Sequence, residues 1–230
     1  MVSSEELHRN VSQETLESLV KIRGEGDNLD FKQIFSMSSK KAKAELVRDM
    51  LAFANTVGGG HLVFGVDKTY SPVGLPSIDT LPALDRQIDT TIIYQTIEKY
   101  IPTDLQFMAA EYVVQRPDWI EKRRFGILYV AQYPYIAMAK CDVSYHDGKE
   151  DIKVLKAADI LIRRGAQSCH IDQTGMKDLI GRTDSFLEHK EDQVSPLDTN
   201  LPPREEVTLE FVGRREELNV LQNWFRDPSR

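Results

Sequence analysis

Three carboxylates and one lysine between positions 25 and 67 have the side-chain chemistry needed to cleave a phosphodiester. Glu25 and Asp30 are five positions apart, Lys32 follows Asp30 by two, and Asp67 closes the apolar run 62–66. Mg²⁺ and Mn²⁺ prefer carboxylate oxygens and keep several waters, so two or three carboxylates suffice to hold one ion. A neighbouring cation can stabilise the charge that develops on a phosphate. Glu25, Asp30 and Asp67 are therefore candidate metal ligands, and with Lys32 they are the candidate catalytic residues.

Two predicted strands position these residues. In the segment 29–32, the two-residue period of a strand sends the apolar pair to the core and places Asp30 and Lys32 together on the other face. The run 62–66 is apolar throughout, which is typical of a buried strand, and Asp67 follows where that strand should emerge. We therefore expect the three carboxylates to converge. The alternative is that Asp30 and Lys32 form an exposed ion pair while Glu25 and Asp67 lie in turns.

A predicted helix separates the two strands, and Asp49 is among its charged residues that lie off the apolar face. The apolar face is formed by residues at helical spacing: Val47, Met50, Leu51 and Ala54. Asn55 and the glycines 58–60 suit the end of this helix and a tight reversal into the second strand. A backbone cradle for phosphate is the alternative for the glycines, but they follow a helix and so lack the favourable dipole of its N-terminus.

Five ordered pieces of sequence contain or follow these residues. They are Glu25-x4-Asp30-Phe-Lys, Ala52-Phe-Ala-Asn-Thr-x-Gly-Gly, Gly65-Val-Asp67, Val73-Gly-Leu75 and the closing run 160–168. Together they resemble the Schlafen-type, AlbA-like domain over about residues 12–185. The resemblance implies that Glu25, Asp30 and Asp67 match the acidic residues of members that cleave RNA, while other members are non-catalytic regulators.

One departure from the family pattern concerns the acidic residues themselves. The family usually has Glu where this chain has Asp30, which shortens that side chain by one methylene. Asp27 lies beside Glu25 and is a further acid that could replace it as a metal ligand.

The composition is that of a globular chain from a reducing compartment. Its 230 residues are 41% apolar, enough for one good core. Cys141 and Cys169 are too few for a disulfide scaffold, and no basic-then-apolar signal or 18-residue apolar run is present. We therefore expect a cytoplasmic protein that does not contact the membrane.

The net charge of −7 is concentrated in one segment, because residues 184–217 carry ten acidic and four basic side chains. The rest of the chain is near neutral and has local basic clusters at 40–43, 122–124 and 163–164. Such clusters can bind phosphates without a basic whole, so Lys40, Lys41, Arg163 and Arg164 are candidate nucleic-acid contacts. Strand alternation places only one of the two arginines on the substrate face. Solvated surface lysines and structural ion pairs are the alternatives.

The pattern of elements predicts an α+β fold with a mixed, mainly antiparallel sheet and flanking helices, because helices and strands do not alternate regularly. Besides the elements above, we expect helices at 12–22, 81–100 and 174–189, strands at 105–114, 125–132 and 152–163, and a loop or irregular hairpin at 133–149.

Three regions follow from this pattern: a Schlafen-like, AlbA-type nuclease domain at 1–190, an acidic proline-containing linker at 191–206, and a last segment at 207–230. In the last segment, Phe211-Val-Gly-Arg-Arg-Glu-Glu-Leu resembles the opening of a STAND or AAA-type NTPase domain, so we expect a truncated start of such a domain. An amphipathic tail helix is the alternative.

The functional expectation is a metal-dependent endonuclease that cleaves RNA, such as tRNA, within a prokaryotic antiviral STAND-type NTPase. Its partners would be RNA, favoured over DNA, and other copies of the protein that associate through the NTPase region. A non-catalytic DNA- or RNA-binding regulator and a protein-interaction or oligomerisation module are the alternatives. RNA against DNA, the cleavage specificity and the activating trigger stay open.

Overall fold

The central sheet has the strand order β1-β2-β4-β3 within the part of the chain that the structure describes. The structure is a computed structural model, and it describes residues 2–117 and 119–193. The strands are β1 (Leu29–Lys32), β2 (Gly60–Phe64), β3 (Phe107–Val114) and β4 (Arg123–Val130). β1 and β2 are parallel, and the other two pairings are antiparallel. The mixed, mainly antiparallel α+β fold is therefore confirmed.

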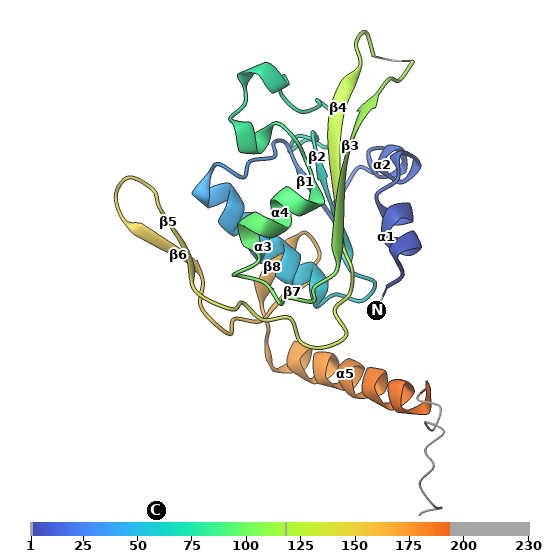
Figure 1. Cartoon of the computed structure of the whole chain (residues 1–230), viewed down its shortest axis with the longest axis vertical. Helices are drawn as coiled ribbons and strands as arrows, with labels where there is room; N and C mark the ends of the chain where they lie inside the picture. The colour runs from blue at the N-terminus through green and yellow to red at the C-terminus, as the bar shows by residue number, and fades with distance from the viewer. Residues whose placement is uncertain (1, 118, 194–230) are drawn as a thin grey trace, which may run out of the picture. The chain divides into compact units, whose positions relative to one another are not determined.

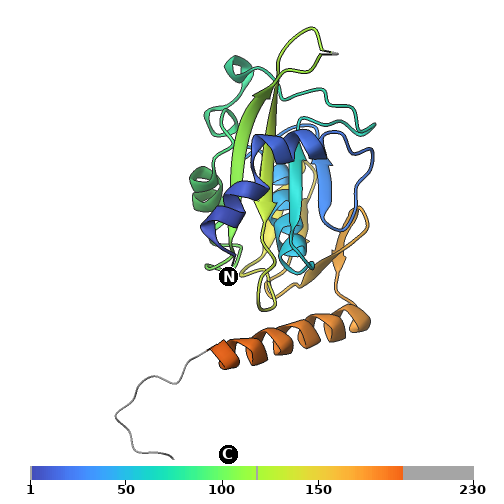
Figure 2. The same ribbon diagram turned by 90° about the vertical axis from the view of Figure 1, so that its right-hand side faces the viewer.

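Helices cover both faces of this sheet, which explains why β2 is apolar on both sides. The helix α3 (Lys40–Ala54) connects β1 to β2 and packs on one face, where Leu62 and Phe64 belong to its apolar cluster. The helices α1 (Ser4–Asn10) and α2 (Gln13–Leu19) cover the opposite face, where Val63 joins a second cluster. Figures 1 and 2 show the two layers from perpendicular directions.

The predicted alternation of β1 is confirmed. Leu29 and Phe31 pack into the cluster under α1 and α2, so Asp30 and Lys32 face α3. Asp30 is nevertheless only 4% exposed, because α3 covers that face. Asp30 is thus a buried charge and not a member of an exposed ion pair.

Two small hairpins and four further helical segments complete the described region. The hairpins pair β5 (Val143–His146) with β6 (Asp151–Leu155), and β7 (Leu161–Arg164) with β8 (Gln167–His170). Short 3₁₀ turns at Ile78–Thr80 and Ala83–Asp85 precede α4 (Thr90–Ile97), and α5 spans Gln173–Gln193. No helix among the described residues is long and apolar enough to cross a membrane.

Some predicted elements have different bounds. The helix expected at 81–100 is a 3₁₀ turn followed by α4, because Asp89 caps α4 at its start by accepting the N–H groups of Thr91 and Ile92. The strand expected at 152–163 is divided into β6 and β7 at a turn where Ala158 has a φ of +66°. The helix α1 was not predicted.

The C-terminal predictions fall largely beyond the described residues. The helix α5 ends at Gln193, so the linker expected at 191–206 begins within it. The remainder of that linker and the NTPase-like segment 207–230 lie outside the described residues. The described residues up to 188 form one compact unit, and this unit contains the site described below.

Asn55 ties the end of α3 to the segment that carries β7. Its side chain is 2% exposed, accepts the N–H of Ala137 at 2.8 Å, and donates to the carbonyls of Ala137 and Leu161 at 2.8 Å each. The expected structural role of Asn55 is therefore confirmed. Gly59 has a φ of +71°, and a Cβ there would lie 2.1 Å from the carbonyl oxygen of Val130, so only glycine fits this reversal.

Candidate active site

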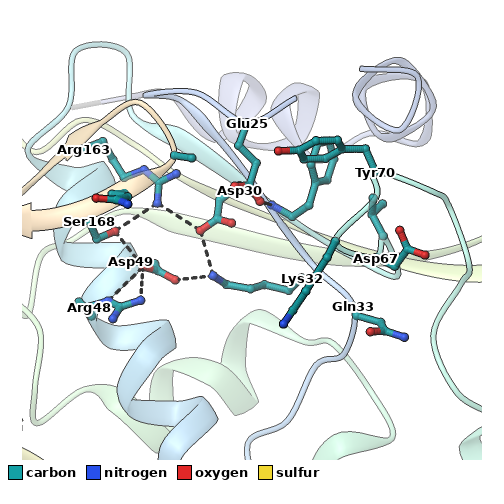
Figure 3. A pocket seen from close by; sticks show the side chains of 15 residues that line it. Glu25, Asp30, Lys32, Gln33, Arg48, Asp49, Asp67, Tyr70, Arg163 and Ser168 are labelled. Carbon is teal, nitrogen blue, oxygen red and sulfur yellow. Dashed lines mark hydrogen bonds and ion pairs between the residues drawn. The ribbon is translucent and has the colours of Figure 1, made fainter. Parts of the chain in front are cut away.

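A cleft of about 570 Å³ lies between β1, α3, the loop after β2 and the β7–β8 hairpin (Figure 3). All four residues predicted to be catalytic line it: Glu25, Asp30, Lys32 and Asp67. Arg163 lines it as well. The cleft therefore joins residues that are far apart in the sequence.

Asp30 lies between two cations. Its Oδ2 is 3.0 Å from Lys32 Nζ and 3.1 Å from Arg163 Nη1. Arg163, 6% exposed, also donates to the carbonyl of Gly26 and lies over the ring of Phe53 with 4.9 Å between guanidinium carbon and ring centroid. A buried carboxylate is costly unless it is paired, so Arg163 and Lys32 make this position tolerable for Asp30.

Lys32 in turn lies between two carboxylates. Its Nζ is 3.0 Å from Asp30 Oδ2 and 2.9 Å from Asp49 Oδ2. Burial opposes the ammonium form, but the charge of Asp49, and then that of Asp30, raise the pKa of Lys32 above its usual value. Lys32 therefore stays charged at neutral pH while 31% of its side chain remains exposed.

Asp49 is the site residue that the sequence analysis missed. It was expected among the charged residues of α3 that lie off the apolar face, yet it is 1% exposed. Its Oδ1 accepts the hydroxyl of Ser168 at 2.8 Å and is 3.4 Å from Arg48 Nη2. A sequence signal did exist, because Asp49 lies three residues after Leu46 and four before Phe53, on an otherwise apolar stripe.

These contacts close a ring of five polar side chains. Its members, in order of contact, are Lys32, Asp30, Arg163, Ser168 and Asp49, and Asp49 returns to Lys32. The dashed lines in Figure 3 follow this ring. The ring connects β1, α3, β7 and β8, so it joins the β7–β8 hairpin to the sheet and holds two acids and two bases in compensating positions.

Glu25 lies beside Asp30 at the edge of the ring. Its Oε1 accepts the N–H of Phe31 at 3.0 Å. Burial raises the pKa of Glu25, and a hydrogen bond with Asp30 and the charge of Asp30 raise it further, against the lowering effects of Phe31 N–H and Lys32. A carboxyl group with a raised pKa beside a second carboxyl group is an arrangement that suits a divalent cation.

Asp67 lines the cleft but does not join Glu25 and Asp30. Its Oδ1 accepts the Thr69 hydroxyl and the N–H groups of Thr69 and Ser71 at 2.7 to 2.9 Å, and these bonds, that of the Thr69 hydroxyl first, lower the pKa of Asp67. Figure 3 shows it beyond Lys32 and Tyr70 from the ring. No group of three His, Cys, Asp or Glu side chains in the described region is arranged to hold one metal ion. The expected convergence of three carboxylates is therefore corrected to a pair.

The pair Glu25 and Asp30 is a set of oxygen donors that fits a divalent cation. Mg²⁺ in proteins is commonly bound by one or two carboxylates and completes its shell with waters and phosphate oxygens. Glu25 and Asp30 supply those two carboxylates. Asp27, the alternative ligand, does not line this cleft; it accepts the N–H of Gly165 at the tip of the β7–β8 hairpin.

The predicted phosphate-binding cations have different environments. Arg163 faces the cleft, whereas Arg164 forms an exposed ion pair with Asp172 at 2.6 Å, as strand alternation required. Lys40 and Lys41 are exposed in the first turn of α3. Lys41 lines a second cleft of about 320 Å³, and Lys32 lines both clefts. Lys41 is therefore better placed than Lys40 to bind a phosphate near the site.

A family model described as Schlafen, AlbA_2 matches residues 25–172 of this chain. The chain belongs to this family. The matched segment contains Glu25, the whole polar ring and Asp67, and membership of the Schlafen, AlbA_2 family indicates nucleic-acid binding or nuclease function.

Comparison with individual proteins adds little to this assignment. No curated protein matches the chain. Among solved structures, the DIP2311 protein from Corynebacterium diphtheriae is 18% identical, with a TM-score of 0.41. That match covers 78% of this chain but 32% of the other chain, so this protein spans about a third of its length.

Proposed function

We propose that the chain is a metal-dependent endonuclease that cleaves RNA in the cleft formed by β1, α3 and the β7–β8 hairpin. The observation that carries the proposal is the adjacent pair Glu25 and Asp30, held beside a charged Lys32 in that cleft. Family membership supports the nucleic-acid substrate, and the resemblance of Glu25, Asp30 and Asp67 to RNA-cleaving members supports RNA over DNA.

The charges that line the cleft support a requirement for metal. Among the described residues that line it, carboxylates and cations are equal in number, four of each: Glu25, Asp30, Asp49 and Asp67, with Lys32, Arg48, Lys68 and Arg163. A polyanion therefore meets a nearly neutral cleft. A divalent cation held by Glu25 and Asp30 would neutralise the scissile phosphate and lower the pKa of a bound water.

The chain's own residues would position the substrate and move the proton. Lys32 has three N–H donors, and its exposed part can direct one of them to a phosphate oxygen. Glu25, whose pKa is raised, can accept the proton of the attacking hydroxyl or water when it is ionised. Lys68 and Arg48 line the same cleft and can bind flanking phosphates.

A second candidate function is a regulator that binds DNA or RNA without cleaving it. One observation favours it: Asp30 is already paired with Lys32 and Arg163, and Asp67 is engaged with its own turn. The protein groups that already bind these carboxylates compete with a metal ion for the same oxygens. The two functions predict the same nucleic-acid surface and differ only in turnover.

The proposal extends to the larger architecture suggested by the sequence. The segment 211–218 resembles the start of a STAND or AAA-type NTPase, which would join this domain to self-association in an antiviral defence protein of prokaryotes. Tethered copies have a high effective concentration, so assembly would increase the cleavage rate.

The test is a titration of the full chain with Mg²⁺ and Mn²⁺ on labelled tRNA and on single- and double-stranded DNA. The wild type should cut RNA only with metal, and Glu25→Gln and Asp30→Asn should reduce the rate by about 10²–10⁴-fold. Asp151→Asn is the matched control, because that side chain is 84% exposed and lies outside the cleft.

Asp67→Asn distinguishes a metal site formed by Glu25 and Asp30 from one that also includes Asp67. Retained cleavage supports the pair, and loss of cleavage supports a site that Asp67 completes. Metal-independent binding without cutting supports the regulator. Neither binding nor cutting by the wild type contradicts both functions and favours the protein-interaction module.

A further inference from the structure

We propose that Asp49 is a positioning residue, which holds the Lys32 ammonium at the place in the cleft where a phosphate oxygen binds. The inference rests on the proposed nuclease function and extends it to a residue on α3 that neither touches the Glu25–Asp30 pair nor was expected in the site. The residues involved are Asp49, Lys32 and Ser168.

The two oxygens of Asp49 have different partners. Oδ1 accepts the Ser168 hydroxyl and lies near Arg48, so the carboxylate plane is fixed from the side of β8 and of α3 itself. Oδ2 makes no hydrogen bond within the described part of the chain. Lys32 Nζ lies 2.9 Å from it, at hydrogen-bond distance but off the hydrogen-bond direction. Asp49 is thus oriented by other residues, and its second oxygen forms an ion pair with Lys32.

Charge compensation alone does not require this arrangement. Asp30 is shared between Lys32 and Arg163, so Asp49 supplies the second negative charge of the ring, but an acid on an apolar helix stripe must be removed from water at a cost. A buried ion pair is weak evidence for stability, because apolar residues of similar volume are often as good or better. Asp49 can therefore have a role besides its structural one.

That role follows from the flexibility of lysine. The side chain has four methylenes and a mobile ammonium, which loses much rotamer freedom when it is fixed. Asp30 holds Lys32 from β1, and Asp49 holds it from α3, so Nζ has anchors on two elements. Catalytic groups held in place before the substrate arrives avoid that loss in the transition state.

A double-mutant cycle tests this role in the full chain. The variants are Asp49→Asn, Lys32→Met and the double variant, assayed on RNA with Mn²⁺. Asp49→Asn should lower kcat by about 10- to 100-fold, as expected for a displaced catalytic group, and should leave the affinity for a non-cleavable RNA unchanged or tighter, because a negative charge is removed. In the Lys32→Met background, Asp49→Asn should have no further effect on kcat.

Ser168→Ala is the second variant, because it keeps the charge of Asp49 and removes one group that orients it. It should give a smaller loss of kcat, which also disappears in the Lys32→Met background. Equal losses of kcat from Asp49→Asn in both backgrounds would overturn the proposal, since Asp49 would then act independently of Lys32. A weaker affinity for non-cleavable RNA with unchanged kcat would overturn it as well.

Urea unfolding of the wild type, Asp49→Asn, Lys32→Met and the double variant distinguishes failure of this inference from failure of the proposed function. Coupling between positions 49 and 32 in unfolding, together with a wild type that cuts no RNA with any metal, would overturn the nuclease proposal and leave Asp49 as a structural partner of Lys32. Cleavage by the wild type without coupling in kcat would overturn the positioning role alone. Asp151→Asn is again the control, and it should match the wild type in every assay.

Discussion

Asp30→Asn should destabilise the protein, and the size of the loss follows from the ring. The substitution removes the negative charge between Lys32 and Arg163, whose side chain is 1% exposed. Breaking a buried ion pair by deleting one partner costs about 3–5 kcal/mol. Here Arg163 keeps Gly26 and Ser168 as acceptors, Lys32 keeps Asp49, and the new amide oxygen can still accept a hydrogen bond.

We therefore expect a loss near the lower end of that range, about 3 kcal/mol. For a chain of this size, such a loss lowers the melting temperature by about 6–12 °C. Urea unfolding followed by far-ultraviolet circular dichroism at pH 7 without metal measures it. Asp151→Asn, exposed in the β5–β6 hairpin, should not change stability.

An unchanged or higher free energy of unfolding in Asp30→Asn would refute this expectation. Clustered acids repel one another, and from the sequence alone the removal of Asp30 or Asp67 should leave stability unchanged or raise it. An Asp30→Asn variant as stable as the wild type would show that relief of this repulsion outweighs the lost ion pairs. The ring would then contribute little to the fold.

Three further predictions concern other residues. Burial raises the pKa of Asp85, but hydrogen bonds from Ser38, Met37 and Ser36 outweigh it and lower the pKa overall, so Asp85→Asn should lower stability at pH 7. The contribution is complete above the unfolded pKa, so in urea unfolding the difference from wild type should shrink as the pH falls below about 4 and vanish only below the folded pKa. Asn55→Ala should cost about 1–3 kcal/mol by calorimetry, because buried backbone groups at Ala137 and Leu161 lose their partners. Without metal, Glu25 should titrate above the ordinary pKa of 4.5 for glutamate in a carbon-13 NMR titration, because burial and then Asp30 raise its pKa, and added Mg²⁺ should lower that pKa if Glu25 is a ligand.

Local patterns predicted the elements that carry the site. The two-residue alternation of β1 placed Asp30 and Lys32 on one face, and the apolar spacing within α3 located the crossover helix. Arg163 was separated correctly from Arg164 by the same alternation rule. These are properties of a single segment, so the sequence alone determines them.

The pairings between segments were not predictable in this way. Arg163 meets Asp30 across 133 positions and Ser168 meets Asp49 across 119, and no local rule selects one partner among many charged residues. The environment of Asp67 was available in the sequence, because an aspartate followed by Thr69 and Ser71 favours a side-chain-capped turn. The turn, given above as the alternative for Asp67, is the arrangement that the structure shows.

Asp30 stabilises the fold through the ring, whereas Glu25 does not, so a loss of activity has a different meaning in variants of each residue. Asp30 supports the ring, so an inactive Asp30→Asn variant can be inactive because the hairpin has shifted. Glu25 contacts the backbone of Phe31 and lies against Asp30, and burial together with the charge of Asp30 raises its pKa. A raised pKa means that the folded state opposes ionisation, so this group lowers stability as the pH rises above its unfolded pKa. Glu25→Gln removes that opposition and should leave stability at pH 7 unchanged or higher. Cleavage lost in this variant, with an intact unfolding transition, assigns the loss to chemistry; cleavage retained would exclude Glu25 from the reaction and reduce the metal pair to Asp30 alone.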